Sequence, residues 1–141
     1  MANVAEYLEA QVMTAGPHRL HLLVVDGAIR FARRAQEALE HQRWEELDAA
    51  LSRSRDCMTE LIGGLDAERS PDLTDRLKSL FAFVYRNLVL ADLERNPVRL
   101  RDALRILEIH RETWLELGEQ LAREQAAREA VPTPHARSWT T

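Results

Sequence analysis

The sequence predicts an all-α protein that folds as an antiparallel four-helix bundle. Apolar residues recur every three or four positions along most of the chain, which is the period of an amphipathic helix rather than of a strand. The five glycines and five prolines fall mainly at a few places, where they divide the chain into four long segments with short connections. Four such helices bury their apolar stripes best when sequential neighbours pack together and run in alternate directions.

The first helix is expected over residues 17–41 and the second over residues 43–62. Pro17 stands at the first helical position, where proline is favoured because its missing N–H would have no partner there. The main apolar stripe of the first helix comprises Leu20, Leu23, Val24, Gly27, Phe31, Ala35 and Ala38. The stripe of the second helix comprises Trp44, Leu47, Leu51, Met58, Leu61 and Ile62.

The third helix is expected to begin after Ser70-Pro71, and the fourth to begin at Pro97. Ser70 is expected to cap the third helix, since serine is favoured at that position. The third helix would bury Leu73, Leu77, Leu80, Phe81, Val84, Leu88 and Ala91. The fourth would bury Leu100, Leu104, Leu107, His110, Trp114, Leu117 and Leu121.

A short N-terminal element is expected before the bundle and a polar tail after it. Val4, Tyr7, Leu8 and Val12 stand at helical spacing, which predicts a short helix or flap. The stretch VPTPHARSWTT after about Ala130 is expected to be disordered. The chain therefore divides into one helical domain over residues 1–130 and a disordered tail over residues 131–141.

Composition narrows the class of function and the compartment. A chain of 141 residues is one domain by size, and its net charge of −4 disfavours nucleic acid, which needs a concentrated positive face. The single Cys57 cannot form an internal disulfide, which favours a reducing compartment. Neither a signal peptide nor an apolar run long enough to cross a membrane is recognisable. We therefore expect a cytoplasmic protein without membrane insertion.

Two of the predicted helices are apolar on a second side. On the first helix Leu22, Val25, Ile29 and Ala32 lie away from the main stripe, and on the third Phe83, Leu90 and Leu93 do so. A helix that is apolar all round is either central in a core or carries a second buried surface. Because a four-helix bundle has no central helix, these residues need another cover. The N-terminal element could supply it, or a partner could dock an amphipathic helix there.

Catalytic and metal-binding patterns are weak in this sequence. No Glu-x-x-His pair of the kind that di-metal bundle enzymes use is present. His110 falls on the apolar face of the fourth helix, where a packed structural histidine is the simpler interpretation. A signalling or phosphotransfer bundle that uses His110 remains the alternative function. We expect no enzyme activity, no metal and no cofactor.

Three stretches together resemble the FliS family of flagellar secretion chaperones. The first holds Tyr7, Thr14-Ala15-Gly16-Pro17, Leu20, Asp26-Gly27-Ala28-Ile29 and Ala35. The second is LKSLFAFVYRNLVLADLERNP, which is similar to the family's Leu-Tyr-Asp-Tyr segment and the residues after it. The third is ILEIHRETWLEL with Trp114, which is similar to the family's final helix.

The resemblance implies a helical-bundle chaperone that binds the C-terminal segment of flagellin and prevents premature polymerisation. It also implies a hand-over to components of the flagellar export apparatus, and an N-terminal region that can occupy part of the binding groove. The chain departs from the family pattern at Gly16, Val25 and the Phe81-Ala82-Phe83 element, where the family has Ser, an aromatic residue or leucine, and Tyr-Asp-Tyr. Combined with the second apolar sides, the resemblance predicts a partner-binding set of Tyr7, Leu8, Leu22, Val25, Ile29, Phe83, Leu90 and Leu93.

Overall fold

The computed structural model describes residues 16–65 and 70–130 of the chain. Within these ranges all regular structure is helical, as the sequence predicts. The helices are α2 (Pro17–Glu40), α3 (Trp44–Gly63), α4 (Pro71–Glu94) and α5 (Pro97–Ala130). The predicted N-terminal element and the predicted tail beyond residue 130 lie outside the described residues.

Prolines begin three of the four helices, and tight turns follow α2 and α4. At the start of α2 the backbone of Gly16 is extended, and its carbonyl accepts a hydrogen bond of 2.9 Å from the N–H of Leu20. The expected side-chain cap of α4 is absent, because Ser70 makes no side-chain hydrogen bond to the helix. The turns after α2 and α4 use left-handed residues that are not glycine, Gln42 at φ 56° and Arg95 at φ 50°. These turns reverse the chain within two or three residues.

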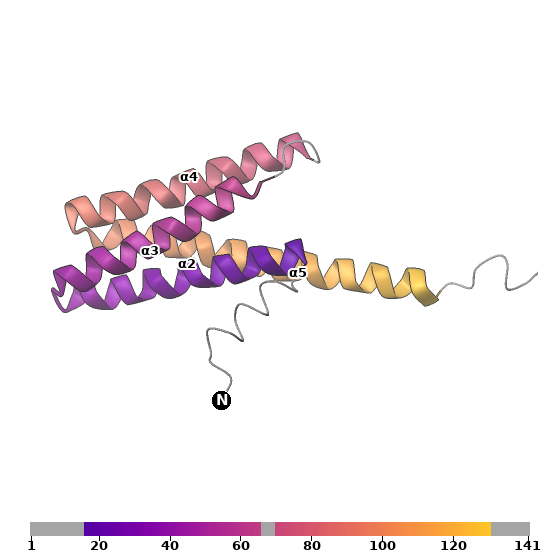
Figure 1. The fold of residues 1–141 in the computed structure, drawn as a ribbon, viewed down its shortest axis with the longest axis horizontal. Coiled ribbons are helices and arrows are strands. Elements are labelled where there is room, and N and C mark those ends of the chain that lie inside the picture. Colours follow the sequence, from indigo (N-terminus) through magenta and orange to yellow (C-terminus); the bar gives the residue numbers. More distant parts are fainter. Residues whose placement is uncertain (1–15, 66–69, 131–141) are drawn as a thin grey trace, which may run out of the picture.

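The helices pack in a ring in which each contacts two neighbours. Helix α2 packs against α3 and α5, and α4 closes the ring by packing against the same two helices. Consecutive helices run in opposite directions along the bundle (Figure 1). The largest fully buried side chains come from all four helices, and they are Val25, Leu47, Leu51, Met58, Phe81, Val84, Leu88, Leu100 and Leu107.

Both apolar sides of α2 pack within the bundle. Gly27, Ala35 and Ala38 of the expected stripe are buried, but Val25 at 0% exposed, Ile29 at 5% and Ala32 at 0% are buried as well, so the side that was expected to face a partner also lies in the core. The prediction that Val25 and Ile29 lie outside the bundle is therefore wrong. The physical reason is that α2 needs two covered sides, and α3 covers one while α5 covers the other. Phe31, expected in the core, is only half-buried.

Gly27 allows α2 and α3 to approach closely. A Cβ atom at this position would lie 3.3 Å from the Sγ atom of Cys57 on α3. One turn further along, the hydroxyl of the buried Ser54 on α3 donates a hydrogen bond of 2.9 Å to the carbonyl of Ala28. This hydrogen bond gives the buried hydroxyl a partner, and without one the hydroxyl would destabilise the α2–α3 interface.

Helix α5 is longer than its apolar stripe. Residues 119–130 are all exposed, and this end of α5 extends beyond the other helices (Figure 1). Its side chains instead pair along the helix surface, with Gln120 to Glu124 at 3.4 Å and Gln125 to Glu129 at 3.1 Å. Each such pair stabilises an exposed helix by about 0.2–0.5 kcal/mol. No helix in the described part of the chain is long and apolar enough to cross a membrane.

Candidate functional site: an apolar groove and an open bundle end

A shallow and widely open apolar groove runs along α4 beside Ile106 of α5. Phe83 is 47% exposed although it is a large aromatic residue, and it lines the groove together with the half-buried Leu80 and Ile106. The groove has a volume of about 590 Å³, and Asp75, Arg76 and Ser79 complete its lining. We call this surface the α4–α5 groove. Contiguous exposed apolar side chains of this kind commonly mark sites of protein binding.

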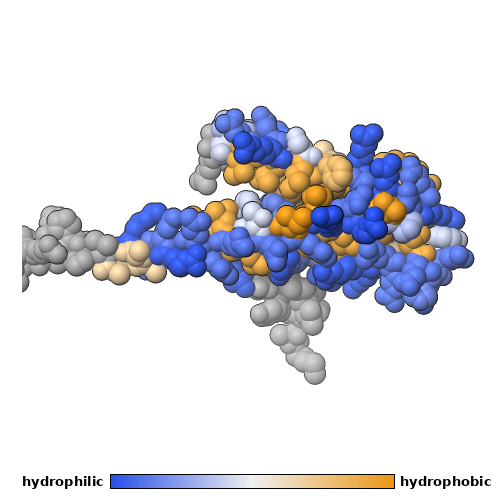
Figure 2. Space-filling model, turned by 180° about the vertical axis from the view of Figure 1, so that it is seen from behind, coloured by the Kyte–Doolittle hydropathy of each residue, from blue (hydrophilic) through white to orange (hydrophobic). Residues whose placement is uncertain are grey.

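The bundle is open at the end where α2 begins. There the end of α3 and the start of α4 diverge from α2 and α5 (Figure 1). Figure 2 shows a hollow between the two pairs of helices, with apolar surface along its walls. Half-buried apolar side chains concentrate in this part of α2 and α5, and they are Leu20, Leu22, Leu23, Val24, Trp114, Leu115 and Leu117. We call this region the open end.

A cluster of aromatic rings joins α2, α4 and α5 near the open end. The Nε2 atoms of His21 and His110 are 2.7 Å apart, so one imidazole donates a hydrogen bond to the other. The ring of His110 meets Phe81 edge-on at 5.0 Å between centroids. Trp114 stacks on His18 at 5.2 Å, and its Nε1–H donates to the carbonyl of His18 at 3.2 Å. These contacts hold the first turn of α2 against α5.

The two central histidines are held in the neutral form. The pKa of His21 is lowered to about 4, mainly by burial and in smaller part by the neighbouring His110 and His18 rings. Burial also lowers the pKa of His110. Since His110 is 5% exposed and packed between rings, a phosphoryl donor cannot reach it without opening the helices. In the part of the chain that the structure describes, no three His, Cys, Asp or Glu side chains form a metal-binding group.

The lowered pKa of His21 predicts a loss of stability in mild acid. Because its folded pKa of about 4 lies below its ordinary value of 6.5, the unfolded chain takes up the proton first as the pH falls. The contribution is complete above about pH 6.5 and is lost progressively towards about pH 4, a loss of about 1–2 kcal/mol after discounting for solvent screening. Urea unfolding at several pH values measures it. The His21→Phe variant should show a shallower pH dependence, and an identical dependence would contradict this assignment.

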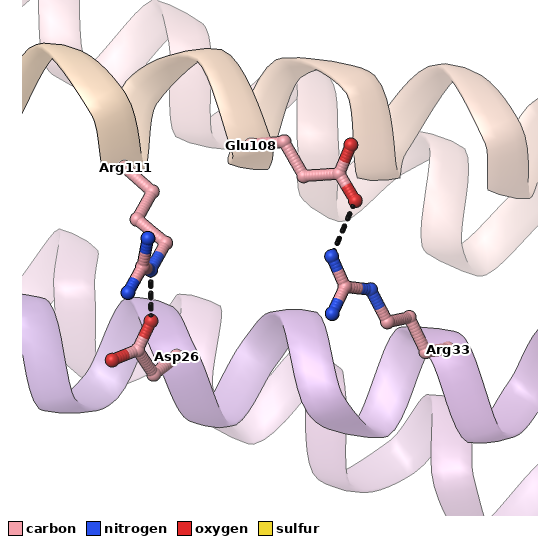
Figure 3. A network of polar contacts seen from close by, with 4 residues as sticks. All are labelled: Asp26, Arg33, Glu108 and Arg111. Carbon is pink, nitrogen blue, oxygen red and sulfur yellow. Dashed lines mark hydrogen bonds and ion pairs between the residues drawn. The ribbon is translucent and has the colours of Figure 1, made fainter.

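Ion pairs link α2 to α5 beside this cluster. The Nε atom of Arg111 lies 2.5 Å from Oδ1 of Asp26, and Nη2 of Arg33 lies 2.9 Å from Oε1 of Glu108 (Figure 3). All four side chains are 40–63% exposed, so each pair contributes less than about 1 kcal/mol to stability. Their main effect is to fix the register of α2 against α5.

The predicted partner-binding residues fall into four groups. Phe83 and Leu93 are exposed at 47% and 77%, while Leu22 and Leu90 are half-buried. Val25 and Ile29 are in the core. Tyr7 and Leu8 lie outside the described residues. Of the exposed members, only Phe83 lines the α4–α5 groove.

Three features of this region were not predicted from the sequence. Ile106 stands off the predicted stripe of the fourth helix, and the same search for a second apolar side would have found it. Leu80 was assigned to the core, yet it is only half-buried and lines the groove. The pairing of His21 with His110 joins positions 89 residues apart, and no local pattern indicates it.

The chain matches proteins of one family along most of its length. Residues 1–121 match the family model described as "Flagellar protein FliS". The chain is 27% identical over 111 residues to the flagellar secretion chaperone FliS of Campylobacter jejuni, which covers 79% of this chain and 87% of that protein. It is 28% identical over 112 residues to the flagellar secretion chaperone FliS of Salmonella typhimurium, covering 79% and 83%. For the protein of the same name from Bacillus subtilis the identity is 26% over 108 residues, covering 77% and 80%.

Proposed function

This chain belongs to the FliS family of flagellar proteins, and we propose that it binds the C-terminal segment of flagellin and keeps it from polymerising before export. The family resemblance inferred from the sequence is confirmed by the family match and by relatives named flagellar secretion chaperones. The structural observation that carries the proposal is the exposed α4–α5 groove next to the open end. We further propose that the protein acts in the cytoplasm and passes its cargo to the export apparatus.

Burial of apolar surface is the proposed source of affinity. Phe83, Leu80 and Ile106 are all partly exposed in the free chain, and a bound amphipathic segment would remove their remaining surface from water. A side chain gains about 1.5–3 kcal/mol when it is buried completely, so half-buried residues gain less. Several such contacts are needed, because a disordered segment loses conformational entropy when it becomes ordered.

The open end would extend this surface beyond the groove. Leu22 and its half-buried neighbours lie in the first turns of α2, and at this end of α2 the end of α3 and the start of α4 diverge from it (Figure 1). A segment that crosses from the groove to the open end would meet apolar side chains from α2, α4 and α5. Tyr7 and Leu8 would compete with it as an intramolecular cover. The proposed action makes and breaks no covalent bond, so it needs neither a catalytic residue nor a cofactor.

Calorimetry and seeded filament growth test the proposed function. The full chain is mixed with flagellin from the same organism and, as control, with flagellin that lacks its C-terminal segment. We expect saturable binding to intact flagellin and none to the truncated form. We also expect an equimolar amount of the chain to suppress the growth of filaments from seeds. Equal binding to both forms of flagellin would place the contact elsewhere on the cargo.

A further inference from the structure

A cluster of three arginines surrounds Phe31 at the seam between α2 and α3. The guanidinium carbons of Arg30, Arg34 and Arg53 lie 5.3, 5.4 and 5.7 Å from the centroid of the Phe31 ring. Arg30 and Arg34 come from α2, whereas Arg53 comes from α3. A guanidinium over an aromatic ring gains about 0.5–1 kcal/mol at an exposed site. The half-buried ring therefore gathers three positive charges that would otherwise repel one another.

None of these three arginines has an ion-pair partner within residues 16–65 and 70–130. On the side of α2 that faces α5, by contrast, Arg33 forms an ion pair with Glu108 (Figure 3). All three guanidinium-bearing residues around Phe31 are exposed, so their N–H donors are open to an incoming group. A carboxylate placed between them would relieve the repulsion and accept charge-assisted hydrogen bonds.

A groove with an apolar lining adjoins this cluster. It has a volume of about 530 Å³ and lies along the α2–α3 seam. Its apolar lining consists of Phe31 and three alanines, Ala38, Ala49 and Ala50, of which Ala38 and Ala50 are buried. Its rim carries Arg34, Arg43 and Arg53 together with Glu37 and Glu46, of which Glu46 is paired with Arg43 at 3.6 Å. Within the residues that the structure describes, the groove thus offers apolar contact and two unpaired arginines, Arg34 and Arg53, beside one carboxylate without an ion pair, Glu37.

We infer that this surface, the α2–α3 groove, docks an acidic amphipathic segment of a partner protein. Carboxylates of that segment pair with Arg34 and Arg53, while a small apolar side chain lies against the alanines of the lining. The net charge of −4 on the whole chain and the carboxylates on the rim disfavour nucleic acid, which needs an extended positive face. Because α2–α3 and α4–α5 lie on opposite sides of the helix ring, such a partner leaves the α4–α5 groove open. The inference does not depend on flagellin binding.

The test is a titration of the isotope-labelled full chain with a short peptide of alternating Glu-Glu and Leu-Leu pairs, followed by amide chemical shifts. We expect the shift changes to concentrate on the facing parts of α2 and α3, around Phe31, Ala38 and Ala50. In the Arg34→Gln/Arg53→Gln variant the affinity should fall about 5-fold or more, since two exposed charge pairs are lost. The Arg86→Gln/Arg123→Gln variant removes the same net charge elsewhere and should bind as the parent does.

Three outcomes would overturn this inference. Equal loss of affinity in both double variants would mean general charge attraction rather than a docking site. Equal binding of a peptide with Gln in place of Glu would mean that carboxylates are not recognised. Binding of an oligothymidylate to the same surface as tightly as the acidic peptide would assign the surface to nucleic acid. We expect the Arg34→Gln/Arg53→Gln variant to bind flagellin as the parent chain does in calorimetry. Failure of the docking inference can then be distinguished from failure of the proposed chaperone function.

Discussion

Replacing Phe83 by aspartate should weaken binding of the flagellin C-terminal segment by about 30-fold or more, a loss of about 2 kcal/mol or more. Phe83 is the most exposed apolar side chain in the lining of the α4–α5 groove. The substitution removes the ring and also places a charge where an apolar partner would have to desolvate it. Folding should be little affected, with a cost of about 1 kcal/mol, because nearly half of the side chain is already in water. Calorimetric titration and thermal unfolding measure the two effects.

Val98→Asp is the matched control for this variant. Val98 is 45% exposed, which is close to the value for Phe83, but it lies in the first turn of α5 at the other end of the bundle. An aspartate there is compatible with the helix dipole, so both binding and stability should be retained. Equal loss of binding in the two variants would point to a charge effect. Unchanged binding in Phe83→Asp would remove the α4–α5 groove from the proposed interface.

The number and position of the helices could be predicted because local rules set them. Pro17, Pro71 and Pro97 each begin a helix, as proline does where the first N–H groups need no partner. The apolar period then identifies each segment as a helix without reference to its neighbours. The outward direction of Phe83 and Leu93 follows from the same period, because the core side of α4 is centred on Val84 and Leu88.

The side of α2 that packs in the core could not be identified from the positions of its large apolar residues. Its buried centre is built around small residues, Ala28, Ala32 and Ala35, each 0% exposed. Small side chains let neighbouring helices approach closely, so they mark the centre of packing even though they add little hydrophobic area. The larger Leu22 and Leu23 lie at the open end, where they are only half-covered. The expected stripe therefore included the buried Ala35 but missed Ala28 and Ala32, which carry little hydrophobic area.

The α4–α5 groove, the open end and the histidine pair could not be predicted from local patterns, because they depend on how the helices pack together. The α4–α5 groove combines Phe83 with Ile106, and the aromatic cluster combines His21 with His110. The groove joins residues of the consecutive helices α4 and α5, and the histidine pair joins positions 89 residues apart. The divergence of the helices is a property of the packed bundle. The sequence indicates that apolar surface is left over, but only the arrangement of the helices decides where that surface lies.

Replacing Ile29 by aspartate should abolish cooperative folding or reduce the free energy of unfolding by about 4 kcal/mol or more. Ile29 is 5% exposed in the core, where α3 and α5 cover the two sides of α2. A carboxylate at this position would lose most of its hydration, and the arginines Arg30 and Arg33 on the adjoining surface would offset only part of that cost. Far-UV circular dichroism and urea unfolding measure the loss.

Ile29→Ala separates the loss of packing from the buried charge. It should cost about 2–4 kcal/mol, since it leaves a cavity without adding a charge, and the protein should still unfold cooperatively. The Phe83→Asp variant provides the comparison for aspartate on a helix surface, and it should lose binding while it keeps its fold. If an Ile29→Asp protein instead remained folded and lost only flagellin binding, Ile29 would belong to a partner-binding surface. The role first predicted for it from the sequence would then be correct, and its burial between α3 and α5 would describe a different state of the chain.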